Sequence, residues 1–313
     1  MQTVDNELHE YFETNIRDPD VDMLDVLWPY VNPHMSEHER ARKAALIVLA
    51  SPLDKHGFRG RCHMLMTGPG GTGKSLIRNW VVKTFSNAYA SGPSDSEAGL
   101  KANLGNGTMT PGALQLAHEG YLGIDELDKY ASEERGALLE AMSDGEFAIN
   151  KGETKQTFDA ETRVIAACNR TEKFRAELID RFDFVIEVEQ YDMDETIVVS
   201  DDRYDHFRAA YVTGDVEDEK YVIPQYLGYI GDYTPGVSEG VLETIKSYKN
   251  TLIQENGLSG GIRKKEAWIR AAFTIARLNR RDMQFEDYVQ AIALVSPGID
   301  QSFAFEDPME NGS

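Results

Sequence analysis

One stretch of the chain, residues 64–80, constrains the fold more than any other. It reads MLMTGPGGTGKSLIRNW: an apolar run enters a glycine-rich turn, and apolar residues then recur at helical spacing. This order predicts a buried strand, a loop and a helix. Glycines let such a loop wrap its N–H groups around a phosphate, because they adopt backbone conformations that a side chain obstructs. We therefore expect an α/β fold built around a nucleotide phosphate.

The side chains of this loop, a Walker A motif, suit the triphosphate of ATP. Lys74 is expected to neutralise the β- and γ-phosphates, and the Ser75 hydroxyl to ligate Mg²⁺. The helix that starts here points the positive end of its dipole at the anion. An ordinary glycine-rich turn is the alternative, and the flanking strand and helix argue against it. The residues predicted to bind the nucleotide are Gly68, Pro69, Gly70, Gly71, Thr72, Gly73, Lys74, Ser75 and Leu76.

Two further predicted strands end in polar residues that ATP hydrolysis needs. The segment GYLGIDELDKY, residues 120–130, ends its apolar run in Asp125, placed to hold the Mg²⁺ shell, and Glu126, placed to polarise the attacking water. The segment RVIAACN ends in Asn169, whose amide can bond the γ-phosphate or that water. Parallel sheets bind ligands at the carboxyl ends of their strands. The alternatives are solvated acids at a strand end and an asparagine that only favours a turn.

Composition sets the class of protein. The 313 residues, 41% of them hydrophobic, leave room for a sizeable core. No apolar run is long enough to span a bilayer, and the N-terminus lacks the pattern of a secretory signal, so we expect a cytoplasmic protein and no membrane partner. Cys62 and Cys168 both fall in predicted buried strands, where a free thiol acts as a small apolar group and a metal site is unsupported.

The net charge of −21, from 53 acidic and 32 basic residues, argues against a nucleic-acid partner, because phosphate binding needs a positive surface. The acids are scattered along the chain and do not form one tail. A dispersed acidic surface also suits a salt-rich cytoplasm, where exposed charges are screened. We therefore expect a halophilic host, or a virus or plasmid of one, with folding and activity that need high salt. Any contact with DNA must then come from a local basic element.

Matches to one family run in order from about Pro29 to Val295. The segments are HMSEHERARKAALIVLAS, GFRGRCHMLMTGPGGTGKS, SEAGLKA, PGALQLAHEGYLGIDELDKY, LLEAMSDGEFAINKGETKQTFDAETRVIAACN, AELIDRFDFVIEV, YLGYIGDYTPGVSEGVLETIKSYKNTL and GGIRKKEAWIRAAFTIARL. Together they resemble the AAA+ core of the minichromosome maintenance (MCM) replicative helicases. The resemblance implies a P-loop NTPase fold, an α/β/α sandwich with a mainly parallel sheet and a small helical lid. It also implies ATP and Mg²⁺ as cofactors.

The resemblance implies roles for five further residues. Asn169 would be sensor 1, Arg181 the arginine finger and Arg263 sensor 2, the two arginines acting from a neighbouring subunit. The segment FAINKGETKQTF predicts two strands around a Lys-Gly turn, with Lys151 at the tip and Lys155 on the returning strand. In the family this hairpin points into the pore of a hexamer and touches DNA phosphates. Taken singly, the hairpin lysine also fits a solvated surface lysine, and the two arginines also fit surface salt bridges.

The chain also departs from the family pattern. Its loop GPGGTGKS is nearer the general AAA+ form, whereas MCM proteins commonly have Asp in place of Pro69. The insert NLGNGTMTP, residues 103–111, is shorter than the usual helix-2 insert, so we expect a small loop there. We expect no N-terminal domain with an OB-fold and zinc ribbon, and no C-terminal winged helix. The expected organisation is an acidic mobile segment at residues 1–25, an α/β domain at 26–190, a helical lid at 191–298 and an acidic tail at 299–313.

Two functions compete, and the first is favoured. It is an ATP-driven DNA helicase of MCM type, a homo-oligomer and expected hexamer that grips single-stranded DNA during replication. The second is a remodelling ATPase of the MoxR and magnesium-chelatase type that acts on a protein. The segments SEAGLKA and GIDELDKY and the hairpin lysine favour the first. A third possibility is a subunit that modulates host replication proteins without activity of its own.

Overall fold

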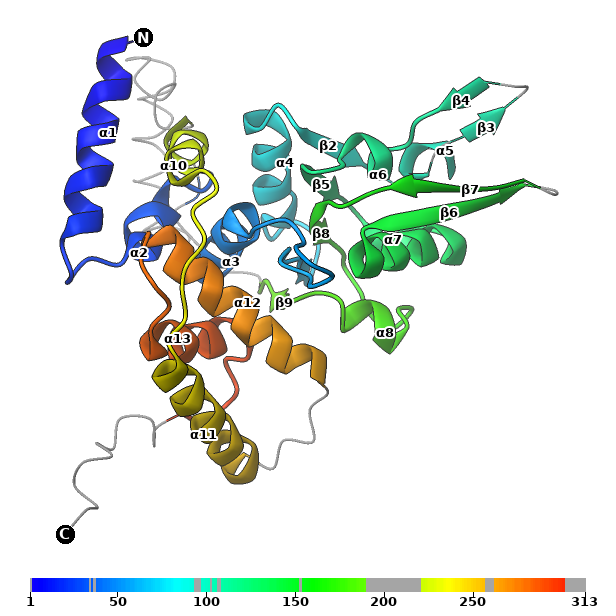
Figure 1. Ribbon diagram of the computed structural model, residues 1–313. Coiled ribbons are helices and arrows are strands. Elements are labelled where there is room, and N and C mark those ends of the chain that lie inside the picture. The colour runs from blue at the N-terminus through cyan, green and yellow to red at the C-terminus, as the bar shows by residue number, and fades with distance from the viewer. Residues whose placement is uncertain are drawn as a thin grey trace.

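The centre of the molecule is a five-stranded parallel sheet in the order β2-β5-β8-β1-β9 (Figure 1). The computed structural model describes residues 2–33, 35, 38–92, 97–101, 103–105, 108–151, 154–189, 221–256 and 262–301. The strands are β1 (Met64–Thr67), β2 (Ala88–Ser91), β5 (Tyr121–Ile124), β8 (Arg163–Ala167) and β9 (Phe184–Glu187). This confirms the expected α/β fold.

The two faces of the sheet pack against different layers. In β1, Met64 and Met66 join a buried cluster with α3 (Glu39–Ala50) and α4 (Lys74–Thr84), whereas Leu65 joins a second cluster with α7 (Ser132–Asp144). Apart from Thr67 and Arg163 at strand ends, the central strands β1, β5 and β8 are apolar, because both of their faces are covered. Because β1 and β5 both pair with β8 in parallel, the carboxyl ends of the three strands meet at one edge of the sheet. This edge is where a nucleotide is expected.

Four helices extend the first cluster beyond the sheet. They are α10 (Val222–Ile230), α11 (Glu239–Glu255), α12 (Ile262–Leu278) and α13 (Phe285–Val295), and all contribute buried residues to it. In Figure 1 they lie on the opposite side of the sheet from α7. The predicted lid boundary at residue 190 stays a prediction, because residues 190–220 lie outside the described part of the chain. Residues 302–313 of the predicted acidic tail also lie outside it.

The N-terminal segment differs from the expectation of a mobile acidic stretch. Residues Gln2–Arg17 form helix α1, which lies beside α10 (Figure 1). Phe12 is 2% exposed, and its ring centroid lies 4.8 Å from that of Tyr226 on α10. Leu8 and Ile16, one turn to either side, pack against the same cluster. The expectation rested on acidic composition and overlooked these apolar residues, which recur every four positions. A short helix, α2 (Met23–Leu27), and a 3-10 turn, η1 (Trp28–Tyr30), connect α1 to α3.

The insert at residues 103–111 also differs from the expectation of a small loop. It contains an antiparallel pair, β3 (Asn103–Gly105) and β4 (Thr108–Thr110), with Asn103 opposite Thr110. A second hairpin, β6 (Glu146–Lys151) and β7 (Thr154–Asp159), follows α7. Both hairpins extend away from the lid helices in Figure 1. The Asn106-Gly107 dipeptide, a strong hairpin signal, could have predicted the first of them.

The remaining elements are short. They are the helices α5 (Glu97–Leu100), α6 (Ala113–Leu116) and α8 (Ala176–Ile179) and the 3-10 turn η2 (Leu127–Lys129). Within the described residues, we find no helix of the length and apolarity that crossing a membrane requires.

Candidate active site

The predicted nucleotide residues surround one cavity. It has a volume of about 460 Å³ and is lined by residues 70–76 of the loop, by Asp125, Glu126 and Asn169, and by Cys168. Gly68 and Pro69 line the adjoining groove. The structure thus brings together the Walker A loop after β1, the acids after β5 and the asparagine after β8. Three segments that are far apart in the sequence meet because their strands are neighbours in the sheet.

Gly68 occupies a position that only glycine fits. Its φ is +133°, and a Cβ at this residue would lie 2.2 Å from the carbonyl oxygen of Val188. Val188 in turn donates its N–H to the Thr67 oxygen at 2.7 Å, which holds the chain leaving β9 against the end of β1. The loop therefore starts where two backbones are in contact.

We predict that Gly68→Ala destabilises the fold by about 3 kcal/mol and weakens ATP binding, because the methyl group overlaps backbone that cannot move aside. Denaturant unfolding and titration with a fluorescent ATP analogue measure the two effects. Gly136→Ala on α7 is the control, since a Cβ there meets nothing within 4 Å. An unchanged unfolding midpoint and affinity in Gly68→Ala would contradict the prediction.

The side chain of Lys74 bonds to atoms of its own loop. Its Nζ donates to the Gly68 oxygen at 2.7 Å, to the Thr72 hydroxyl at 3.2 Å and to the Pro69 oxygen. Burial lowers the pKa of Lys74, and the nearby carboxylates of Asp125 and Asp128 oppose that shift. Phosphate oxygens in the cavity would give this ammonium partners of higher charge than the carbonyls it now bonds.

The two acids after β5 are held by the turn that they form. Asp125 accepts the N–H of Glu126 at 2.9 Å, and Glu126 has a left-handed φ of +49°. Positive φ at a residue other than glycine is uncommon and often marks a functional turn. The Glu126 carboxylate forms an ion pair with Lys129 of η2, which the sequence analysis did not single out. The hydrogen bond from Lys129 raises the pKa of that lysine.

Two further contacts at the site were missed from the sequence. Asp128 accepts the backbone N–H of Asn169 at 3.2 Å, which fixes the exit of β8 next to the turn that carries Asp125 and Glu126. The Nε2 atom of His38, just before α3, lies 2.9 Å from the Thr72 oxygen and braces the phosphate loop. The sequence points to Asp128 only because it is the third acid of DELD, residues 125–128. Nothing near His38 in the sequence indicates its contact with the phosphate loop.

The donor set of the cavity fits a Mg²⁺ ion that arrives with a nucleotide. Ser75 and Asp125 offer a hydroxyl and a carboxylate, the hard oxygen ligands that this ion prefers. Among the described residues, no group of three or more His, Cys, Asp or Glu side chains could hold a metal ion by itself. Cys62 and Cys168 are free and buried, and burial raises the pKa of each to about 12, so both stay protonated thiols.

The two predicted arginines both lie outside this cavity. Neither Arg181 nor Arg263 lines it. Burial lowers the pKa of Arg181, and the next largest cause is repulsion from the charge of Arg263, so the two guanidiniums are within electrostatic reach of each other. Within the described residues, the buried Nε of Arg181 has no hydrogen-bond partner. Neither cation therefore lines the nucleotide cavity of its own chain.

The predicted DNA-binding lysines lie on the long hairpin. Lys151 ends β6 opposite Thr154, in the pair nearest the turn, and Lys155 is opposite Asn150 on the returning strand. This is the backbone position predicted for both residues. Gly152 of the predicted Lys-Gly turn lies outside the described residues.

Comparison with known proteins places this geometry in a family. The model of the MCM P-loop domain matches residues 13–202, more than half of the chain. The chain belongs to the MCM family. It is 27% identical to an uncharacterized MCM-type protein of Methanocaldococcus jannaschii over 88% of this chain and 45% of that protein. It is also 27% identical to DNA replication licensing factor mcm6 of Schizosaccharomyces pombe, over 79% of this chain and 31% of the yeast protein.

A third relative matches over a shorter stretch of the chain. DNA replication licensing factor mcm2 of Schizosaccharomyces pombe is 36% identical over 122 residues, which are 37% of this chain and 15% of the factor. The MCM-family chain thus spans less than half the length of these curated relatives.

Proposed function

We propose that this MCM-family chain is an ATP-driven DNA helicase or translocase that hydrolyses ATP between neighbouring copies of a ring. The observation that carries the proposal is the cavity that joins Lys74, Asp125, Glu126 and Asn169. Among the described residues no arginine lines this cavity, and Arg135 and Arg170 line only the adjoining groove. Phosphoryl transfer needs positive charge where the transition state becomes negative. A second copy of the chain is the simplest source of that charge.

The residues of the cavity divide the chemistry among themselves. Lys74 leaves the loop carbonyls and holds the β- and γ-phosphates, while Ser75 and Asp125 hold the Mg²⁺ shell. When bound there, the ion would supply positive charge against the phosphates. Glu126 accepts the proton of the attacking water, for which it must release Lys129. That ion pair is solvent-exposed, and such pairs are weak, so the carboxylate can leave it easily.

The arginines complete the site from the neighbour. Arg181 and Arg263 repel each other in a single chain, so an anion brought to them from outside is stabilised by both. A head-to-tail contact of this kind closes into a ring when the rotation between copies closes, and we propose a hexamer.

DNA contact is assigned to the β6–β7 hairpin. The chain as a whole carries a net charge of −21, so a DNA strand must meet a local basic element. Lys151 and Lys155 supply it, and the β3–β4 hairpin is the candidate for a second element in the pore. We also propose host replication proteins as partners in the working assembly.

We predict that Lys151→Ala abolishes the stimulation of ATP hydrolysis by single-stranded DNA, so that the ratio of rates with and without DNA falls to about one. The rates are measured in molar KCl with and without an oligonucleotide. Lys83→Ala on α4 is the matched control, because it removes an exposed lysine away from both hairpins, and it should keep the wild-type ratio. Robust turnover that ignores DNA in the wild type would favour the alternative, a remodelling ATPase with a protein substrate.

A further inference from the structure

A buried carboxylate connects the segments that carry the two proposed trans-acting arginines. The side chain of Asp183, the residue before β9, is fully buried at 0% exposure. Its Oδ1 accepts from Arg59 Nη2 at 2.8 Å and from Arg270 at 2.6 Å (Nη2) and 3.0 Å (Nε). One carboxylate oxygen thus joins an arginine before β1 to an arginine on α12.

Asp183 fixes the segment that carries Arg181. Its Oδ2 accepts the N–H of His63 at 2.8 Å, and its own N–H bonds the His63 oxygen at 2.9 Å. Arg59, held by Asp183, donates through Nη1 to the Arg181 carbonyl oxygen at 3.2 Å. The backbone of Arg181 is therefore tied to the carboxylate through one intermediate side chain.

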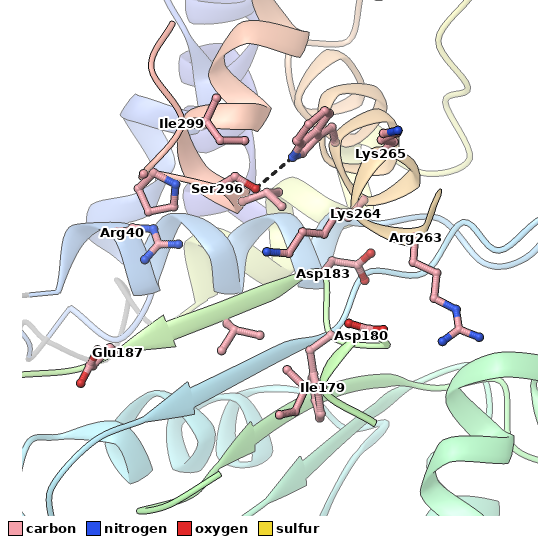
Figure 2. A pocket seen from close by; sticks show the side chains of 17 residues that line it. Arg40, Ile179, Asp180, Asp183, Glu187, Arg263, Lys264, Lys265, Ser296 and Ile299 are labelled. Carbon is pink, nitrogen blue, oxygen red and sulfur yellow. Dashed lines mark hydrogen bonds between the residues drawn. The ribbon is translucent and has the colours of Figure 1, made fainter. Parts of the chain in front are cut away.

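Asp183 also holds helix α12, which it contacts through Arg270. Arg270 lies two helical turns after Arg263, so both residues are on the same face of that helix. Figure 2 shows Arg263 and Asp183 beside a cavity of about 630 Å³ between β9 and the lid helices, with Asp183 below the first turns of α12. The Arg270 contact thus sets where α12 places Arg263 relative to β9.

We propose that Asp183 is a positioning residue that sets the distance between Arg181 and Arg263, so that both reach a phosphate bound to the neighbouring copy. The proposal rests on the proposed function of these arginines. The physical reason is charge: the guanidiniums of Arg59 and Arg270 both bond one oxygen of Asp183, and without that carboxylate their repulsion would move α12 away from β9. The buried carboxylate holds the two elements together against that repulsion.

The test replaces Asp183 by asparagine, which keeps the shape and loses the charge. Asp183→Asn is expected to lower kcat about 100-fold with a change in the KM for ATP below about twofold, because only the trans-acting groups move. Asp287→Asn is the matched control: this lid carboxylate is 2% exposed and pairs with Arg281 at 2.7 and 2.8 Å, far from Arg181 in the sequence. Should Asp183→Asn fail to fold, Arg270→Lys keeps the charge of Arg270 and loses its two-nitrogen contact.

Two readouts separate positioning from general damage. Mixing Asp183→Asn with Lys74→Ala should restore hydrolysis, because the intact phosphate loop of the first is then served by the intact arginines of the second, whereas mixing it with Arg181→Ala should not. Hydrogen exchange should rise in residues 262–270 of Asp183→Asn and stay unchanged there in Asp287→Asn. The exchange measurement needs no ATPase, so it decides the positioning role even if the wild type proves inactive and the proposed function fails. Unchanged exchange in that segment would overturn the proposal, and so would a kcat no lower than in the control where the wild type hydrolyses ATP.

Discussion

Glu126→Gln is expected to lower ATP turnover about 1,000-fold while ATP still binds, because an amide cannot accept the proton of the attacking water. The substitution keeps the size of the side chain and the left-handed turn at this residue. It also removes the ion pair with Lys129, which is solvent-exposed and should matter little for stability. Single-turnover hydrolysis measures the rate, and titration with a fluorescent ATP analogue measures the affinity.

The control for this prediction is Glu133→Gln, an exposed acid in the first turn of α7. It should turn over ATP at the wild-type rate. If Glu126→Gln keeps a rate within about tenfold of the wild type, the general base is another group. Asp128, the remaining acid of this turn and the partner of the Asn169 backbone, is then the first candidate.

Arg181→Ala is expected to lower kcat about 1,000-fold, the range known for an arginine that meets the γ-phosphate in the transition state. The residue does not line the nucleotide cavity of its own chain, so ATP binding to an isolated copy should not change. Arg181→Lys should recover only part of the rate, because an ammonium cannot offer the paired N–H groups of a guanidinium. Steady-state kinetics over a range of protein concentrations measure both variants.

The control for this substitution is Arg175→Ala, an exposed arginine just before α8 in the same segment. It should leave kcat unchanged. If Arg181→Ala turns over ATP like the wild type, then Arg181 is not the finger, and Arg263 has to be tested in its place.

The parts of the site that could be predicted from the sequence are those with local signals. The phosphate loop, the acids after β5 and Asn169 each follow an apolar strand, and the parallel sheet brings the ends of these strands together. The long hairpin also had a local signal, because the Lys-Gly pair of FAINKGETKQTF predicts a turn between two strands.

The contacts that could not be predicted join residues far apart in the chain. His38 meets Thr72 across 34 residues, and Asp128 meets Asn169 across 41. Asp183 reaches Arg59 across 124 residues and Arg270 across 87, so its role depends on how α12 packs on the sheet. Helix α1 was not predicted because its apolar side chains, which recur every four residues, stand among many acidic ones.

The most direct test of the central claim, that a second copy completes each ATP site, is hydrolysis by a mixture of Lys74→Ala and Arg181→Ala. One variant lacks the phosphate-binding lysine and the other lacks the finger, so each alone should be inactive. In the mixture, some interfaces pair an intact loop with an intact arginine, and hydrolysis should return and peak near equal amounts. A mixture that stays as inactive as its components, at protein concentrations where the wild type forms rings and hydrolyses ATP, would contradict the claim.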